Sequence, residues 1–265
     1  MRQIFNLLAF LFFFTACNNR EKDQPPAASN IDAQEKKMQE AINKYPDSLL
    51  LKENLIQYYR DNGNYDMAIG FTNNCIKADS NNFRLWDIIG TLYYENEDTT
   101  AAIKAYEKAI VVYPDMQIIK SLGSIYAQTK NARALNMADA LLHFDKAHSE
   151  KEALFIKGLY YNYTGEKLKA ITYFDSCLSK DYTFMVAYRE KGIALYDMGK
   201  YDAAITLLDK AVTLQNNFDE GYYWMGRCFE KLNKVNEAIE QYQMALQYDP
   251  EFIEARDALG KLGVK

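Results

Sequence analysis

Small and large apolar positions recur along this chain at a fixed interval of 34 residues. Gly158, Gly192 and Gly226 are 34 residues apart, and so are Ala68 and Ala102. Large side chains accompany the small ones at fixed positions. They are Tyr59, Tyr93, Tyr126, Tyr161, Leu195 and Phe229, followed by Tyr106, Phe174, Leu208 and Tyr242. A period of this length indicates supersecondary units that bury their apolar faces by stacking on one another.

One stretch identifies the kind of repeat. The segment WDIIGTLY, Trp86 to Tyr93, is followed by Ala102, Tyr106 and Pro114. This spacing resembles the tetratricopeptide pattern W-x2-L-G-x2-Y … A-x3-F … P. The resemblance implies an all-α fold, a right-handed α-solenoid of about six helical hairpins with N- and C-terminal capping helices.

The small residues have two expected roles. Those within helices are expected where two backbones cross closely, and Gly63, Gly165 and Gly199 are expected to end helices in a left-handed conformation. The helix positions are Gly90, Gly123, Gly158, Gly192 and Gly226 on first helices, and Ala102, Ala170, Ala204 and Ala238 on second helices.

The period divides the chain into segments. After a signal (1–16) and a flexible tether (17–30) we expect an N-terminal capping helix (31–48), six repeat units and a C-terminal capping helix (253–265). The units are 49–82, 83–115, 116–150, 151–184, 185–218 and 219–252. The second half of the third unit fits the pattern poorly, so a longer or reoriented helix is expected there.

The N-terminus has the layout of a secretory signal. Arg2 precedes an apolar run of 11 residues from Ile4 to Phe14, interrupted only by Asn6. Such a run is too short for a transmembrane helix, which needs ~20 residues. Thr15-Ala16-Cys17 then resembles the lipobox of bacterial lipoproteins, although Phe14 stands where that family most often has Leu. The alternatives are an ordinary secretory signal or an uncleaved stub.

The lipoprotein resemblance implies that Cys17 carries acyl chains that anchor the protein in the cell envelope, in the outer membrane of a gram-negative bacterium. The polar, Pro-containing residues 17–30 would then act as the tether. Three charged residues near Cys17, at 21–23, are weakly similar to a surface-export signal.

Candidate chemistry is sparse. A net charge of −5 argues against nucleic acid as a partner. His143 and His148 are five apart, whereas metal ligands on one helix face stand three or four apart, so no metal is expected. No phosphate loop, nucleophile elbow or HExxH motif is present, so neither a cofactor nor an enzymatic activity is expected. Cys75, Cys177 and Cys228 are interpreted as small core residues.

In the family that the repeat resembles, partners bind in the concave groove formed by the first helices. The candidate groove residues are Tyr94, Phe155, Asn162, Arg189, Tyr196, Tyr223 and Arg227. The Lys and Asn set with which some members grip a peptide's C-terminal carboxylate is missing. The favoured function is a protein or peptide scaffold in assembly, secretion or cell-wall processes. The alternative is a glycan- or nutrient-binding surface lipoprotein, and an enzyme is the weakest hypothesis.

Overall fold

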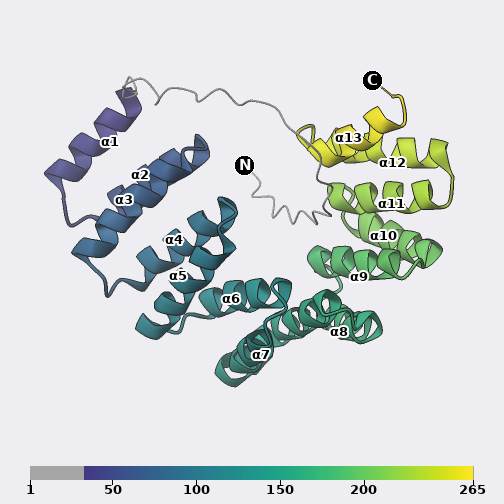
Figure 1. Cartoon of the computed structure of the whole chain (residues 1–265), viewed down its shortest axis with the longest axis horizontal. Helices are drawn as coiled ribbons and strands as arrows, with labels where there is room; N and C mark the ends of the chain where they lie inside the picture. The colour runs from purple at the N-terminus through teal and green to yellow at the C-terminus, as the bar shows by residue number, and fades with distance from the viewer. Residues whose placement is uncertain (1–32, 265) are drawn as a thin grey trace, which may run out of the picture. The chain divides into compact units, whose positions relative to one another are not determined.

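The computed structural model describes residues 33–264, and every regular element in that range is an α-helix. The expected signal, Cys17 and the tether lie outside the described residues. Figure 1 labels the helices, which are α1 (Ala33–Lys44), α2 (Leu49–Asp61), α3 (Tyr65–Ala78), α4 (Phe83–Glu95), α5 (Thr99–Val112), α6 (Met116–Gln128), α7 (Arg133–Tyr163), α8 (Lys167–Lys180), α9 (Met185–Asp197), α10 (Tyr201–Leu214), α11 (Asp219–Lys231), α12 (Val235–Tyr248) and α13 (Ile253–Lys261).

The chain divides into two compact units, with the boundary inside α2. The first ends at Leu51, and its helix α1 has no fully buried residue. The second begins at Lys52. The candidate groove residues all belong to the second unit.

Within the second unit, each helix from α3 to α13 packs against the next helix of the chain. Helix α9 also contacts α11, and α7 contacts α9 (Figure 1). The first helices of successive hairpins therefore lie side by side, which is the arrangement that presents one row of side chains on a shared face.

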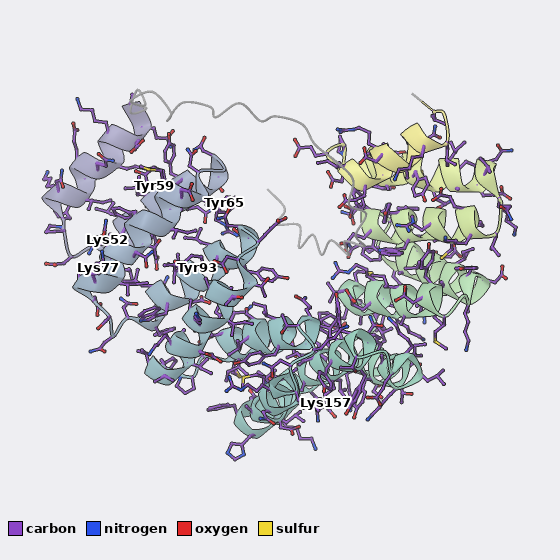
Figure 2. The ribbon with its side chains drawn as sticks, viewed as in Figure 1. Lys52, Tyr59, Tyr65, Lys77, Tyr93 and Lys157 are labelled. Carbon is purple, nitrogen blue, oxygen red and sulfur yellow. The ribbon has the colours of Figure 1, made fainter. Side chains whose placement is uncertain are left out.

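Tyrosines at the repeat positions contribute to the core. Tyr59, which is labelled in Figure 2, is 3% exposed, and Tyr106, Tyr126 and Tyr242 are at most 4% exposed. These buried rings stabilise the stack and are not available to a ligand.

The helix glycines accommodate large side chains and not crossing backbones, which corrects the expectation from the sequence. A Cβ atom at Gly158 would lie 2.5 Å from Cε1 of Phe174, and one at Gly226 would lie 2.6 Å from Cε1 of Tyr242. Gly90 is related to Tyr106 in the same way, at 2.9 Å. In each pair the large residue comes 16 positions later, on the second helix of the hairpin. In these three pairs, the small and the large repeat residues therefore pack against one another.

The turns inside the hairpins use the left-handed conformation that the sequence predicted at three glycines. Gly63, Gly165 and Gly199 have φ of 70°, 91° and 72°. The corresponding turns of the other hairpins place non-glycine residues there, namely Glu97 (63°), Lys130 (58°) and Asn233 (58°). These three positions were not found from the sequence, because only glycine marks this conformation clearly.

The irregular third hairpin runs into the fourth without a loop. Helix α7 has 31 residues and is interrupted only at Asp145, whose backbone is non-helical (φ −155°, ψ 84°). The Asp145 carboxylate accepts a hydrogen bond from the backbone N–H of His148 at 3.2 Å. Because this is the geometry of a helix N-cap, the second half of α7 begins at this aspartate.

Candidate functional site

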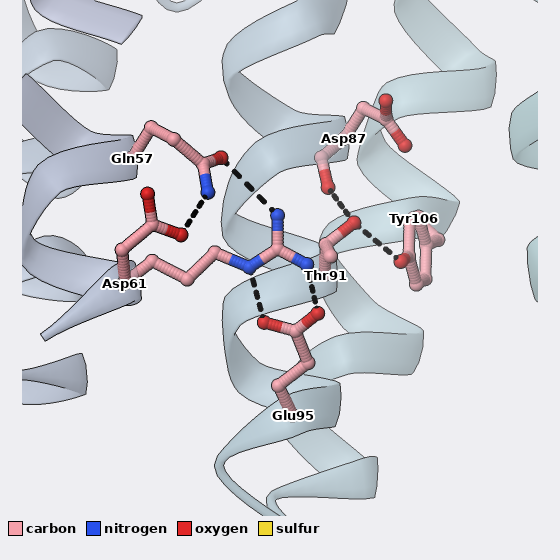
Figure 3. Close-up of polar contacts among 7 residues, drawn as sticks. Gln57, Asp61, Asp87, Thr91, Glu95 and Tyr106 are labelled. Atoms are coloured by element: carbon pink, nitrogen blue, oxygen red, sulfur yellow. Dashed lines mark hydrogen bonds and ion pairs between the residues drawn. The ribbon is translucent and has the colours of Figure 1, made fainter. Parts of the chain in front are cut away.

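Polar residues on the first helices pair across neighbouring hairpins. Arg60 of α2 pairs with Glu95 of α4, with Nε 2.6 Å from Oε2, and its Nη1 donates to Gln57 (Figure 3). One turn before Glu95, the hydroxyls of Thr91 and Tyr106 lie 2.9 Å apart. Such contacts satisfy groove-facing groups inside the protein, so a candidate position is available for binding only where this pairing is incomplete.

Two of the predicted groove residues are held by such polar contacts. The Tyr94 hydroxyl on α4 donates to Oε1 of Gln128 on α6 at 3.0 Å, and burial raises the pKa of Tyr94. Asn162 of α7 is 4% exposed, and its Oδ1 accepts from Nζ of Lys167 at 2.7 Å. Lys167 also pairs with Asp197 of α9 at 2.6 Å. These contacts connect successive hairpins.

Phe155 of α7 packs inside the stack. Its ring centroid lies 5.3 Å from that of Phe184 and 5.9 Å from that of Phe174, and the residue is only half-exposed. Aromatic pairs at these separations contribute to packing. The structure therefore gives this side chain a core contact at the position predicted to face a partner.

Arg189 of α9 is 9% exposed and takes part in a buried ionic cluster. Its Nη1 donates to both carboxylate oxygens of Glu220 on α11, at 2.7 and 2.9 Å, and its Nε donates to Glu190 at 3.1 Å. Burial alone would lower the pKa of Arg189, but Glu190 and Glu220 raise it. The guanidinium is thus charged and fully engaged within the protein.

The remaining three predicted residues converge. Nη1 of Arg227 donates to the Tyr223 hydroxyl at 2.9 Å, and Nη2 donates to the Tyr196 hydroxyl at 3.3 Å. The guanidinium carbon lies 5.5 Å from the ring centroids of Tyr196 and Trp224 and 5.8 Å from that of Tyr223. Cation–π attraction at these distances holds the guanidinium in one place.

This cluster lines a pocket of about 390 Å³ between α9, α11 and α13. Its lining residues are Tyr196 of α9, Tyr223, Arg227, Glu230 and Lys231 of α11, and Glu254, Ala258 and Lys261 of α13. Three side chains with positive charge and two with negative charge therefore surround a space of ligand size.

The contribution of α13 was missed from the sequence. Residues 254, 258 and 261 stand at i, i+4 and i+7, which places them on one face of a helix. That spacing was visible, but the segment lies after the last repeat and was interpreted only as a cap. Trp224 was also missed, because groove positions were assigned from the repeat alone.

Other chemistry is not indicated in the part of the chain that the structure describes. No group of three or more His, Cys, Asp or Glu residues there could hold a metal ion. Cys75, Cys177 and Cys228 are buried free thiols, and burial raises the pKa of Cys177 and Cys228 to about 12. Those thiols are therefore protonated and unreactive at neutral pH. None of the described helices is long and apolar enough to cross a membrane.

Comparison with protein families gives the class of the fold. Residues 83–115 and residues 195–262 match models described as "Tetratricopeptide repeat". The chain therefore contains tetratricopeptide repeats, and the second match covers the pocket from Tyr196 to Lys261.

Solved structures share the fold across most of the chain. A tetratricopeptide repeat protein from Parabacteroides merdae superposes with a TM-score of 0.74 at 18% identity, over 86% of this chain and 91% of that one. PilW, described as a widely conserved type IV pilus biogenesis factor, has a TM-score of 0.61 at 18% identity, over 79% of this chain and 97% of its own. The fold is therefore a tetratricopeptide-repeat solenoid.

A curated relative matches part of the chain. Stress-induced-phosphoprotein 1 of Caenorhabditis elegans is 22% identical over 170 residues, which are 64% of this chain and 51% of that protein. This chain thus spans about half the length of the curated relative.

Proposed function

We propose that this protein is a protein-binding scaffold whose partner docks at the pocket between α9, α11 and α13. The fold supports a scaffold, because tetratricopeptide solenoids present the faces of their first helices to other proteins. Among the groove residues predicted from the sequence, Tyr196, Tyr223 and Arg227 gather around an open space, whereas Tyr94, Asn162 and Arg189 pair within the stack.

The observation that carries this proposal is the environment of Arg227. Its guanidinium is held by two tyrosine hydroxyls and three aromatic rings at the wall of a 390 Å³ pocket. Tyr, Trp and Arg are the residue types most frequent at interface hot spots, because they combine a large contact area with directed hydrogen bonds. The partner is therefore a protein or peptide that buries this cluster.

We further propose that the scaffold is anchored in the cell envelope by lipid on Cys17, facing a partner in assembly, secretion or cell-wall processes. The N-terminal pattern that ends at Cys17 supports the anchor, since two or three acyl chains give stable attachment. PilW is one instance of a protein with this fold, and it is described as a type IV pilus biogenesis factor.

A glycan-binding role is less well supported. Sugar rings stack on exposed aromatic faces, but Arg227 already lies over the rings of Tyr196, Tyr223 and Trp224. These three aromatic rings are thus committed to holding a cation.

Position-dependent photocrosslinking in intact cells tests the scaffold. A photoreactive amino acid replaces Glu254 at the pocket, which leaves the lining cations in place, or, as the control, Lys77 on α3, which is exposed (Figure 2). We expect discrete protein adducts from position 254 and none from position 77. Equal adducts from both positions, or none from position 254, would contradict docking at the pocket.

A further inference from the structure

The positive charge of Arg227 is held in place without a carboxylate at hydrogen-bond distance among the described residues. The two groups that accept its Nη hydrogen bonds are neutral tyrosine hydroxyls. The nearest carboxylate of the described residues, Glu230, has Oε2 4.0 Å from Nε, which is beyond hydrogen-bond distance. The same oxygen accepts a hydrogen bond from the Tyr242 hydroxyl. Glu230 is therefore directed toward α12 and leaves the guanidinium fork without a bidentate acceptor.

Two further cations line the same pocket. Lys231 follows Arg227 by one helical turn on α11, and Lys261 ends α13 on the opposite wall. Within residues 33–264 neither lysine forms an ion pair. Glu230 and Glu254 are the two lining carboxylates that oppose these three cations, so the lining carries a net positive charge.

Arg133 of α7 has a similar environment, but its guanidinium is paired with a carboxylate. It donates to the Tyr126 hydroxyl at 3.1 Å and lies 5.8 Å from the centroid of that ring, much as Arg227 does with Tyr223. Arg133 also pairs with Glu107 at 2.6 Å. At Arg227 the nearest carboxylate oxygen is 4.0 Å from Nε, so the close carboxylate that completes the Arg133 site is missing there.

From this difference we infer that the pocket between α9, α11 and α13 takes an acidic segment of the partner, with a Glu or Asp carboxylate on the Arg227 fork and further carboxylates toward Lys231 and Lys261. A guanidinium pairs with a carboxylate through two parallel hydrogen bonds. The distribution of three cations over two helices fits several acidic side chains better than one chain terminus. The inference rests on the proposed protein-binding function and specifies the chemistry of the segment that binds.

Preorganisation explains how the site selects this segment. The rings and hydroxyls fix the guanidinium before binding, so little side-chain entropy is lost when a carboxylate arrives. The whole chain has a net charge of −5, which disfavours non-specific binding of acidic peptides. Binding of an acidic segment therefore depends on this local group of cations, and salt weakens it by screening.

Fluorescence anisotropy with defined peptides tests the inference on the full chain in a mild detergent at low salt. The probe is a fluorescein-labelled peptide of alternating Glu and Ser with an amidated C-terminus, and its control alternates Gln and Ser. We expect the Glu peptide to bind and the Gln peptide not to bind. We expect Arg227→Met and Lys231→Glu each to weaken binding by about tenfold or more, whereas Arg133→Met leaves it unchanged.

Several results would overturn the inference. They are equal binding of both peptides, equal binding by wild type and Lys231→Glu, or binding only when the Gln peptide has a free C-terminal carboxylate. Lys231 is exposed on α11, so its substitution tests the site even if Arg227→Met does not fold. If crosslinks from position 254 persist while the Glu peptide fails to bind, the scaffold stands and its acidic ligand is rejected.

Discussion

Arg189 of α9 donates to both carboxylate oxygens of Glu220 of α11, at 2.7 and 2.9 Å. Seven residues further along each helix, Tyr196 meets Arg227 at 3.3 Å. Seven residues are two helical turns, so both contacts lie on the same faces of the two helices. The buried ion pair therefore holds α9 against α11 two helical turns before the position at which the two helices form the pocket.

This relationship predicts the cost of breaking the ion pair. Arg189→Met leaves Glu220 and the neighbouring Glu190 buried without their counter-ion, so the free energy of unfolding should fall by about 3–5 kcal/mol. Adding Glu220→Gln should recover part of that loss, because one uncompensated charge is removed. Urea unfolding followed by circular dichroism measures both variants. A single variant as stable as wild type would show that the pair does not hold the helices.

Two glycine substitutions should have opposite effects on stability. Gly158→Ala places a Cβ 2.5 Å from the Phe174 ring, which is fully buried, so the free energy of unfolding should fall by about 1–3 kcal/mol. Gly70→Ala on α3 meets nothing within 4 Å, and alanine favours the helix by about 0.5–1 kcal/mol. Thermal unfolding of the two variants under identical conditions compares them. If both variants were less stable than wild type, steric crowding would not explain why position 158 is glycine.

Asp87 on α4 should give the stability a pH dependence. Burial and the nearby charge of Asp115 raise the pKa of Asp87 to about 6, although Arg84 opposes the shift. The unfolded chain has the lower pKa of ~3.9, so the native state binds the extra proton and stability should decrease as pH rises from about 4 to about 6. Asp87→Asn should remove this part of the pH dependence and stabilise the protein at neutral pH.

The titration of Asp87 can be followed by NMR alongside thermal unfolding across the same pH range. Asp115→Asn is a matched variant: asparagine still caps α6, as the Asp115 carboxylate does for Gln117 at 2.7 Å, but carries no charge. It should therefore lower the pKa of Asp87. An unchanged midpoint in Asp115→Asn would contradict this electrostatic account.

The repeat was predictable from the sequence because it depends on residue type at a fixed spacing. Gly158 and Phe174 recur as Gly226 and Tyr242, and both pairs occupy one kind of contact in the structure. Whether a groove side chain is free to bind a partner could not be predicted from the repeat spacing. Arg189 lies at a groove position by period, yet its burial depends on Glu220 of the next hairpin.

The residues that α13 contributes to the pocket could not be predicted from the repeat either, because Glu254 and Lys261 belong to a helix beyond the last repeat. The structure also changes how Tyr223 should be tested. Its ring centroid lies 5.0 Å from that of Phe252 and 5.8 Å from that of Tyr242, so truncation to alanine would remove packing as well as a binding group. Tyr223→Phe removes only the hydroxyl.

Lipidation of Cys17 is a prediction from the N-terminal sequence. Cells grown with an alkyne analogue of palmitate should label the wild-type protein and not Cys17→Ser, because the thiol is the expected site of acylation. In-gel fluorescence of the captured protein measures the label. Equal labelling of both proteins, or of neither, would rule out the anchor.

Binding of the crosslinked partner to purified variants tests most directly whether the pocket is the docking site. Tyr223→Phe combined with Arg227→Met should weaken the binding of that partner by ~2 kcal/mol or more, since both changes remove hot-spot groups. Arg133→Met should bind as wild type does, because its guanidinium is already paired with Glu107 outside the pocket. Circular dichroism must show that all three proteins are folded. Equal dissociation constants for wild type and the double variant would place the partner elsewhere on the protein.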